Sequence, residues 1–286
     1  MRVFKPLLAL IALGGVPGGA VARAAELQPA AKADWEAYVR AADLQMESRL
    51  AAGPFLWIDE APGREARVRN GDVLVAPGME NGTRSVRNGL IHHWVAAAFI
   101  PRAKLAEVLR VAHDCANYER YYRPEIVDSK LLASAGDEQK FSMRTLHRVL
   151  FITAVVESEF ATRDFVVDRT RRYIVADSTR VQEVENYGRP NERALPPDRG
   201  RGYVWRLHTI TRYEVRDGGV YVEMEAIALS RDIPAGLRWL VSPTVSRFSQ
   251  NELMTSLRKT REAVMGAGSA EQRLDTAELG RLAMGR

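Results

Sequence analysis

The sequence predicts an α+β fold in which helices are segregated to one face of an antiparallel sheet. Between residues 125 and 230 almost every segment alternates apolar and polar side chains, which is typical of strands. Residues 33–53 near one end and 249–264 near the other carry apolar side chains at helical spacing instead. Since the helical segments flank the run of strands, we expect a long antiparallel meander bordered by helices.

The first residues have the pattern of an export signal. Arg2 and Lys5 precede the apolar stretch PLLALIALGGVPGGAVA, and the small residues of ARAAE follow. A basic start, a short apolar segment and an A-x-A site predict that residues 1–25 are a signal peptide, cleaved after Ala24 or Ala25. Glycine and proline interrupt the apolar stretch and disfavour a transmembrane helix, although a retained anchor is the alternative. We expect a periplasmic or secreted protein of bacterial type.

Charge and cysteine content exclude several classes of partner. Subtracting Arg2, Lys5 and Arg23 from the net charge of +5 leaves +2, and no lysine- or arginine-rich block suited to a phosphate backbone remains. We therefore expect no nucleic-acid partner. The single cysteine, Cys115, allows no disulfide within the chain and no cysteine metal cluster, and we expect a buried thiol. Without a glycine-rich phosphate motif, no cofactor or metal is predicted.

The N-terminal part is predicted as one helix followed by a hairpin. Residues 33–53 form the helix, which Gly53 and Pro54 end. In REARVRNGDVLVAPG, Asn70 and Gly71 have the side chains of a type I′ turn and predict a β-hairpin. Residues 26–87 would thus form an extension of helix and hairpin before the main domain.

The main domain begins with the strand 89–100, and Pro101 opens a helix with an apolar stripe that ends near Cys115. Six strands follow. Their approximate ranges are 125–134, 139–151, 154–168, 171–184, 203–216 and 219–230.

Three further segments complete the chain. Residues 186–202 hold three prolines and three glycines between two strands, which suits either a functional lid or a mobile loop. Residues 236–247 are apolar and helical in pattern, and a capping box at Ser249 and Glu252 predicts that a helix restarts there. We expect residues 266–286 to be a frayed or disordered tail.

A two-residue turn at Asp217 and Gly218 sets the register of the last two strands. The predicted pairs are Val215–Val220, Tyr213–Val222, Thr211–Met224, Thr209–Ala226 and Leu207–Ala228 on one face, and Glu214–Tyr221, Arg212–Glu223 and Ile210–Glu225 on the other. The second face carries the charges, including the complementary pair Arg212–Glu223. We expect this face to be solvated, which makes an acid–base pair of Glu223 and Glu225 improbable.

The uncharged face mixes aromatic rings, small side chains and hydroxyls. The small side chains leave room for a ligand, and the hydroxyls can orient it. An ordinary core with satisfied threonines is the alternative. The candidate ligand-binding residues on this face and on the strand 139–151 are Phe141, Met143, His147, Trp205, Leu207, Thr209, Thr211, Tyr213, Val222 and Met224.

The order of elements resembles a known superfamily. A strand enters a helix at FIPRAKLAEVLRVAHDCANYERYYRPEIVDSKLL, a long meander follows, and LRWLVSPTVSRFSQNELMTSLRKTREAV ends the domain as an amphipathic helix. Over residues 88–265 this is similar to the START/Bet v 1 (SRPBCC, polyketide cyclase-like) superfamily. The resemblance implies the helix-grip fold, a curved antiparallel sheet wrapped around a long C-terminal helix. It does not account for residues 26–87.

The resemblance also implies a cavity between the sheet and the last helix, in which members bind hydrophobic ligands and a few members catalyse reactions on them. This sequence shows no catalytic motif that could be carried over. Our first hypothesis is therefore an exported protein that holds a hydrophobic or amphipathic, lipid-like small molecule. The alternatives are a cyclase- or hydrolase-like enzyme that uses His147 and Tyr213, and a packed structural module in which residues 26–87 bind a partner.

Other polar and apolar features are less specific. His92 and His93 are neighbours on a strand, so they point to opposite faces and cannot jointly bind one metal ion. The segment GLRWLVSP favours a part of the closing helix, with transient membrane contact as the alternative. The sequence gives neither the oligomeric state nor the role of residues 186–202 as a gate.

Overall fold

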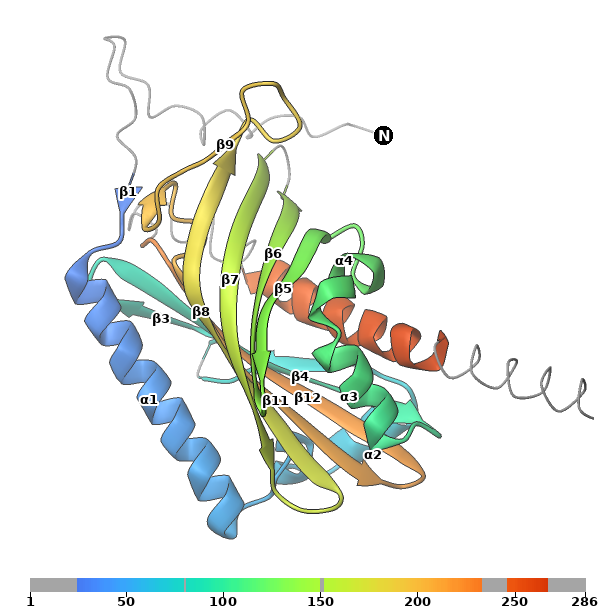
Figure 1. Cartoon of the computed structure of the whole chain (residues 1–286). Helices are drawn as coiled ribbons and strands as arrows, with labels where there is room; N and C mark the ends of the chain where they lie inside the picture. Colours follow the sequence, from blue (N-terminus) through green and yellow to red (C-terminus); the bar gives the residue numbers. More distant parts are fainter. Residues whose placement is uncertain (1–24, 80, 150–151, 233–245, 267–286) are drawn as a thin grey trace, which may run out of the picture.

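The computed structural model describes residues 25–79, 81–149, 152–232 and 246–266. A strongly twisted antiparallel sheet lies between two layers (Figure 1). The long helix α1 (Pro29–Ala52) runs along one face. The helices α3 (Leu105–His113) and α4 (Tyr118–Tyr121) and the helix of residues 246–266 lie on the other side. None of the described helices is long and apolar enough to cross a bilayer.

The strands of the main sheet follow the order β2-β4-β12-β11-β8-β7-β6-β5, and β3 also pairs with β4. Their bounds are β2 Leu74–Pro77, β3 Thr83–Val86, β4 Gly89–Pro101, β5 Ile126–Ala135, β6 Glu138–Val149, β7 Ile152–Val166, β8 Arg171–Glu185, β11 Arg206–Arg216 and β12 Gly219–Ser230. Each long strand lies within a few residues of its predicted range. The predicted antiparallel meander is therefore confirmed.

The register predicted for the last hairpin is confirmed over its whole length. Val215 pairs with Val220, and Leu207 pairs with Ala228. Asp217 and Gly218 have φ values of 56° and 76°, which are the two positive angles that a type I′ turn requires.

The prediction that the charged face of this hairpin is solvated is wrong. Arg212 is 1% exposed, Glu223 is fully buried and Glu225 is 7% exposed. The reason is that residues 26–87 pack over this face through α1, the 3-10 helix η1 (Trp57–Glu60) and α2 (Arg64–Arg69). The sheet thus carries packed residues on both sides, and the face with the charges is the more completely covered one over β12.

The predicted hairpin around Asn70 and Gly71 is also wrong. Residues 64–69 form α2, and the backbone N–H of Asn70 bonds to the carbonyl of Ala66 at its end. Gly71 has a φ of 106°, so its positive angle ends a helix rather than turning a hairpin. The chain then enters β2, which pairs with β4.

The segment 186–202 is tied to the body of the protein. It contains β9 (Arg193–Ala194), which pairs with β8, and β10 (Arg199–Gly200), which pairs with β1 (Ala25–Glu26). In the C-terminal part, residues 246–248 are already helical, so Ser249 does not begin the helix. The predictions for the signal peptide, for most of residues 236–247 and for the tail lie outside the described residues.

Candidate functional site

The two faces of β12 differ in their exposure to solvent. We call the face toward α3 and residues 246–266 the inner face, and the face toward α1 the outer face. The outer-face residues Ile227 and Leu229 are fully buried. The inner-face residues alternate with them and are partly accessible from Met224 to the end of the strand.

Accessible small residues in the middle of a sheet indicate space above them. β12 has hydrogen-bonded neighbours on both sides, β4 and β11, so solvent reaches its alanines only from the inner face. Leu207 and Thr209 of β11 are partly accessible in the same way. We call this set the open floor; it consists of Met224, Ala226, Ala228, Ser230, Leu207 and Thr209.

The other end of the inner face is packed. Tyr213 and Val222 are 4% and 2% exposed and belong to one core cluster with Leu253 and Leu257 of the C-terminal helix. Val108 of α3 completes this contact. The helices therefore close one end of the inner face, and the open floor adjoins it at Met224.

Several predicted site residues gather on the inner face. Phe141, Met143 and Leu207 form a cluster with the buried Cys115, and the Phe141 ring stacks on Phe160 with centroids 5.1 Å apart. Thr209 and Met224 belong to the open floor. Thr211 lies between Thr209 and Tyr213 and is 8% exposed.

Trp205 lies on the opposite side from the one we predicted. It packs against Ile227, Leu229 and the α1 residue Trp35 in the outer-face cluster. The physical reason is that Trp205 precedes β11, which begins at Arg206, so the alternation of the strand does not extend to it.

His147 and Tyr213 are not brought together. The strands β7 and β8 lie between β6 and β11, so three strand spacings, about 14 Å along the sheet, separate their backbones. His147 Nδ1 instead lies 3.2 Å from Glu252 Oε2, and the His147 ring is perpendicular to the Phe248 ring, with centroids 5.3 Å apart. Burial raises the pKa of Tyr213, which keeps its hydroxyl neutral.

Two inner-face residues are not among the ligand-binding residues predicted from the sequence. His92 and Trp94 of β4 pair with Ala228 and Ala226, so their side chains border the open floor. They are 6% and 5% exposed, yet His92 Nδ1 and Trp94 Nε1 have no hydrogen-bond partner among the described residues. Because the strand 89–100 is buried on both faces, its sequence alone does not show which residues face inward.

The predicted opposite orientation of His92 and His93 is confirmed. His92 Nε2 lies 2.9 Å from Ser230 Oγ, whereas His93 Nε2 lies 2.9 Å from Glu225 Oε1 on the outer face. Tyr38 of α1 contacts the other ring nitrogen of His93 at 2.8 Å.

The outer-face carboxylates are engaged in holding the N-terminal extension. Glu223 accepts hydrogen bonds from the backbone N–H groups of Trp57 and Ile58 and from Arg212. Burial opposes ionisation of Glu225, but the hydrogen bond with His93 and the charge of Arg212 outweigh burial and lower its pKa to about 2. These carboxylates therefore stabilise the docking of the extension and are not free for acid–base chemistry.

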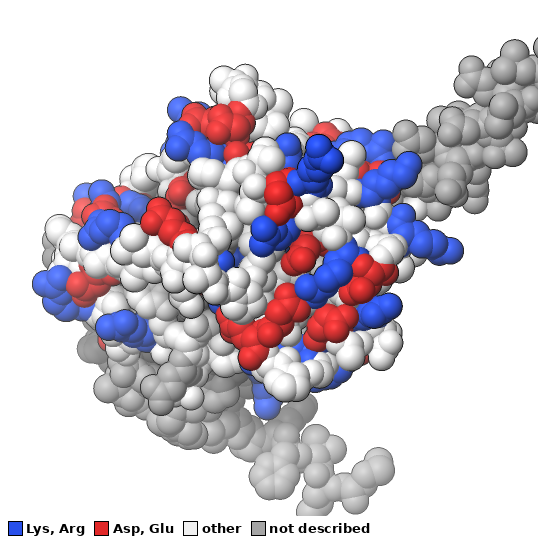
Figure 2. Space-filling model, turned by 90° about the horizontal axis from the view of Figure 1, so that it is seen from below, with Lys and Arg blue, Asp and Glu red and all other residues white. Residues whose placement is uncertain are grey.

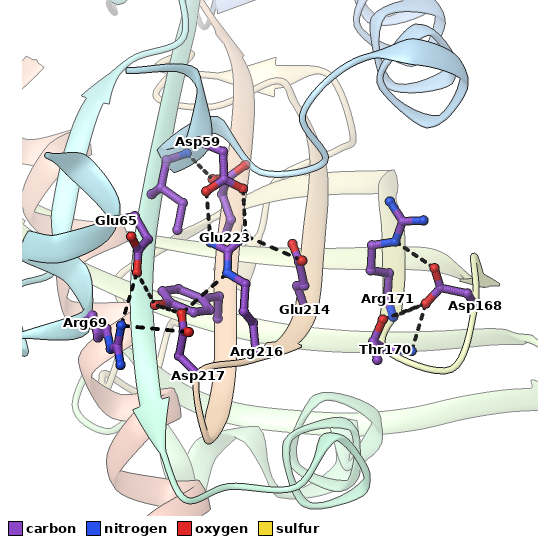
Figure 3. Close-up of polar contacts among 12 residues, drawn as sticks. Asp59, Glu65, Arg69, Asp168, Thr170, Arg171, Glu214, Arg216, Asp217 and Glu223 are labelled. Carbon is purple, nitrogen blue, oxygen red and sulfur yellow. Dashed lines mark hydrogen bonds and ion pairs between the residues drawn. The ribbon is translucent and has the colours of Figure 1, made fainter. Parts of the chain in front are cut away.

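Charges at the rim of this contact are paired as well. Figure 2 shows acidic and basic side chains intermingled on the face seen from below. Figure 3 shows Arg216 between Asp59 of η1 and Glu214, and Arg69 of α2 near Asp217. The extension is thus held to the sheet by ion pairs at its edge and by the buried cluster at its centre.

Comparisons with known proteins give fold-level likenesses. No family model matches the chain, and no curated protein matches it. A STAR-related lipid transfer protein from Xanthomonas axonopodis is 15% identical, with 68% of this chain and 98% of that chain covered and a TM-score of 0.43. Human STARD10 is 12% identical, with 73% and 81% covered and a TM-score of 0.44. The Zhui aromatase/cyclase from Streptomyces sp. R1128 is 14% identical, with 64% and 96% covered and a TM-score of 0.42.

The architecture itself identifies the fold. A twisted antiparallel meander packs its inner face against α3 and against the C-terminal helix through Leu253 and Leu257. The chain therefore has the α+β helix-grip fold that the sequence predicts.

Proposed function

We propose that this protein binds a hydrophobic or amphipathic small molecule against the open floor, next to the C-terminal helix. The observation that carries the proposal is the exposure pattern of β12, in which outer-face residues are buried and inner-face residues remain accessible. Two alanines, Leu207, Met224 and the hydroxyls of Thr209 and Ser230 line this surface, a mixture of apolar contacts and few polar groups that suits small-molecule sites.

The alternatives account less well for the same features. A packed interaction module requires the inner face to be as closed as the outer face, and Ala226 and Ala228 are not. An enzyme that uses His147 and Tyr213 requires the two side chains to meet, and two strands lie between theirs.

Native mass spectrometry of the full mature chain, with organic extraction of any bound molecule, tests the proposal. We expect a co-purifying apolar molecule, or saturable binding of an added probe such as naphthalene. Met224→Trp should abolish either one because it fills the open floor. The matched control is Val166→Trp, at a position 65% exposed at the end of β7, which should bind normally. If neither a bound molecule nor saturable binding is found, or if both variants bind alike, the proposal is wrong.

We also infer export through cleavage of the N-terminal segment. The basic residues Arg2 and Lys5 and the apolar stretch after them support it. Cleavage after Ala24 retains Ala25, whose backbone pairs with Gly200, and this favours the earlier of the two predicted sites. The intact mass of the protein recovered from the periplasm or medium tests it; an uncleaved chain would contradict the inference.

A further inference from the structure

The inference concerns the shape of the open floor. Two small residues, Ala226 and Ala228, follow one another on the inner face of β12, and both are partly accessible. Each is paired with a larger residue on either side, from β4 and from β11. The two cross-strand rows are Trp94–Ala226–Thr209 and His92–Ala228–Leu207.

A row of small side chains between two rows of larger ones forms a groove, because strand side chains stand roughly perpendicular to the sheet. We call this feature the β12 groove. Ala226 and Ala228 form its floor, and the four larger residues of the two rows form its walls. The groove therefore runs along β12, not across the sheet.

The groove is bounded at both ends. Val222, which is 2% exposed and belongs to the packed cluster of the inner face, lies beyond Met224. At the other end, His92 Nε2 lies 2.9 Å from Ser230 Oγ, and this contact crosses from β4 to β12. Met224 and Ser230 are six residues apart on one strand, so the groove is up to about 20 Å long.

The width of the groove follows from the spacing of its walls. β12 separates β4 from β11, so the two wall strands lie about 10 Å apart. A single hydrocarbon chain in contact with carbon atoms on both sides needs about 7–8 Å between those atoms. A group two carbon atoms wide needs about 11 Å. The groove is thus wide enough for one chain and too narrow for a bulky ring system.

The parallel row on β8 does not form a second groove of this kind. Its partly accessible residues are Ile174, Ala176 and Ser178. Only one of them is an alanine, and Ser178 Oγ accepts the backbone N–H of Leu207 at 2.8 Å. β12 is the strand on which two alanines follow one another.

We propose that the ligand is a compound with an unbranched aliphatic chain, which lies lengthwise in the β12 groove; this rests on the proposed function. Each methylene of such a chain contacts the floor and both walls at once. A branched or cage-like hydrophobe of the same size contacts only the tops of the walls.

The test compares three alcohols with the same number of carbon atoms on the full mature chain at pH 7. The probes are 1-decanol, which is a straight chain, 2-naphthol, which is flat, and 1-adamantanol, which is a cage. Each is titrated by calorimetry, and its affinity is divided by its measured water–octanol partition coefficient. We expect the corrected affinity to be highest for 1-decanol and lowest for 1-adamantanol. This ranking needs no variant to fold.

Two alanine variants test the direction in which the chain lies. Ala226→Leu fills the middle of the groove and should weaken 1-decanol about tenfold, because its side chain takes the place of about two ligand methylenes. Ala176→Leu is the matched control on β8, where Ala176 pairs with Thr209 on the far side of β11. A chain that lies along β12 does not reach it, so this variant should bind 1-decanol normally.

The outcomes separate the two proposals. If the three probes bind saturably in proportion to their partition coefficients, or if Ala176→Leu weakens 1-decanol as much as Ala226→Leu does, the lengthwise chain is wrong and the binding function stands. If none of the probes binds saturably, the proposed function fails as well.

Discussion

Arg212 Nη1 donates a 2.9 Å hydrogen bond to Glu223 Oε1 in the interior between the sheet and the N-terminal extension. Arg212 also pairs with Glu225 through Nη2, and its Nε contacts Met46 Sδ of α1 at 3.1 Å. Since the charges are buried, their energy depends on the extension that covers them. Residues 26–87 are therefore a structural part of the domain.

Removing one member of this cluster should destabilise the protein strongly. Arg212→Met leaves two buried carboxylates without their cation, and we expect a loss of about 3–5 kcal/mol in the free energy of unfolding. Urea denaturation measures it. The control is Arg163→Met, whose ion pair with Glu138 is about half exposed (55% and 50%) and should cost less than about 1 kcal/mol. Equal losses for both variants would contradict the structure.

The stability should fall at alkaline pH because of His208. Burial by itself lowers the pKa of His208, but the carboxylates of Asp177 and Asp43 outweigh burial and raise it to about 9. A histidine whose folded pKa lies above its ordinary value of 6.5 stabilises the fold fully below that value. This stability is lost as the pH rises from 6.5 through 9.

The measurement is the free energy of unfolding at pH 6 and pH 9.5. Asp43 and Asp177 are 46% and 56% exposed, so solvent screening limits the decrease to on the order of 1–2 kcal/mol. His208→Gln removes the titrating group and should flatten the profile. A variant that keeps the full decrease would assign it to another residue.

The open floor should tolerate a larger side chain where the outer face does not. Ala226→Leu extends into accessible space, and we expect a change below about 1 kcal/mol in the free energy of unfolding. Ala97→Leu, at a position 1% exposed on the outer face in a cluster with Met46 and Phe55, should cost about 1–3 kcal/mol through overpacking. Thermal or urea unfolding of both variants measures the difference, and the reverse order would show that the inner face is filled.

The segment 186–202 should be held in place by Glu183. The carboxylate accepts backbone N–H bonds from Arg201, Gly202 and Tyr203, at 2.7, 2.7 and 3.1 Å. Glu183→Ala removes these acceptors. Hydrogen exchange should then be faster at the three amides, and the free energy of unfolding should fall by about 2 kcal/mol or more.

The exposed neighbour on the same strand provides the control for this variant. Glu185→Ala breaks only a surface ion pair with Arg193 and should leave exchange at residues 201–203 unchanged. Unchanged hydrogen exchange at residues 201–203 in Glu183→Ala would show that Glu183 does not hold the segment in place.

The strands and their register follow from local chemistry, which explains why the sequence predicts them. Asp217 and Gly218 specify a two-residue turn, and alternation then sets each pair from Val215–Val220 to Leu207–Ala228. The placement of Phe141, Met143 and Leu207 on one face follows from the same period of two. Trp205 departs from it because it precedes the strand.

The sequence by itself determined the α+β class, the antiparallel meander and the opposite faces of His92 and His93, because turns and alternation act between residues close in the chain. Only the tertiary structure decided that the charged face is buried, because the residues that cover Arg212 and Glu223 come from an extension far away in sequence. The same holds for the inner-face residues His92 and Trp94. The face on which Trp94 lies is set by pairing of β4 with β12, more than a hundred residues later, and no local pattern encodes that contact.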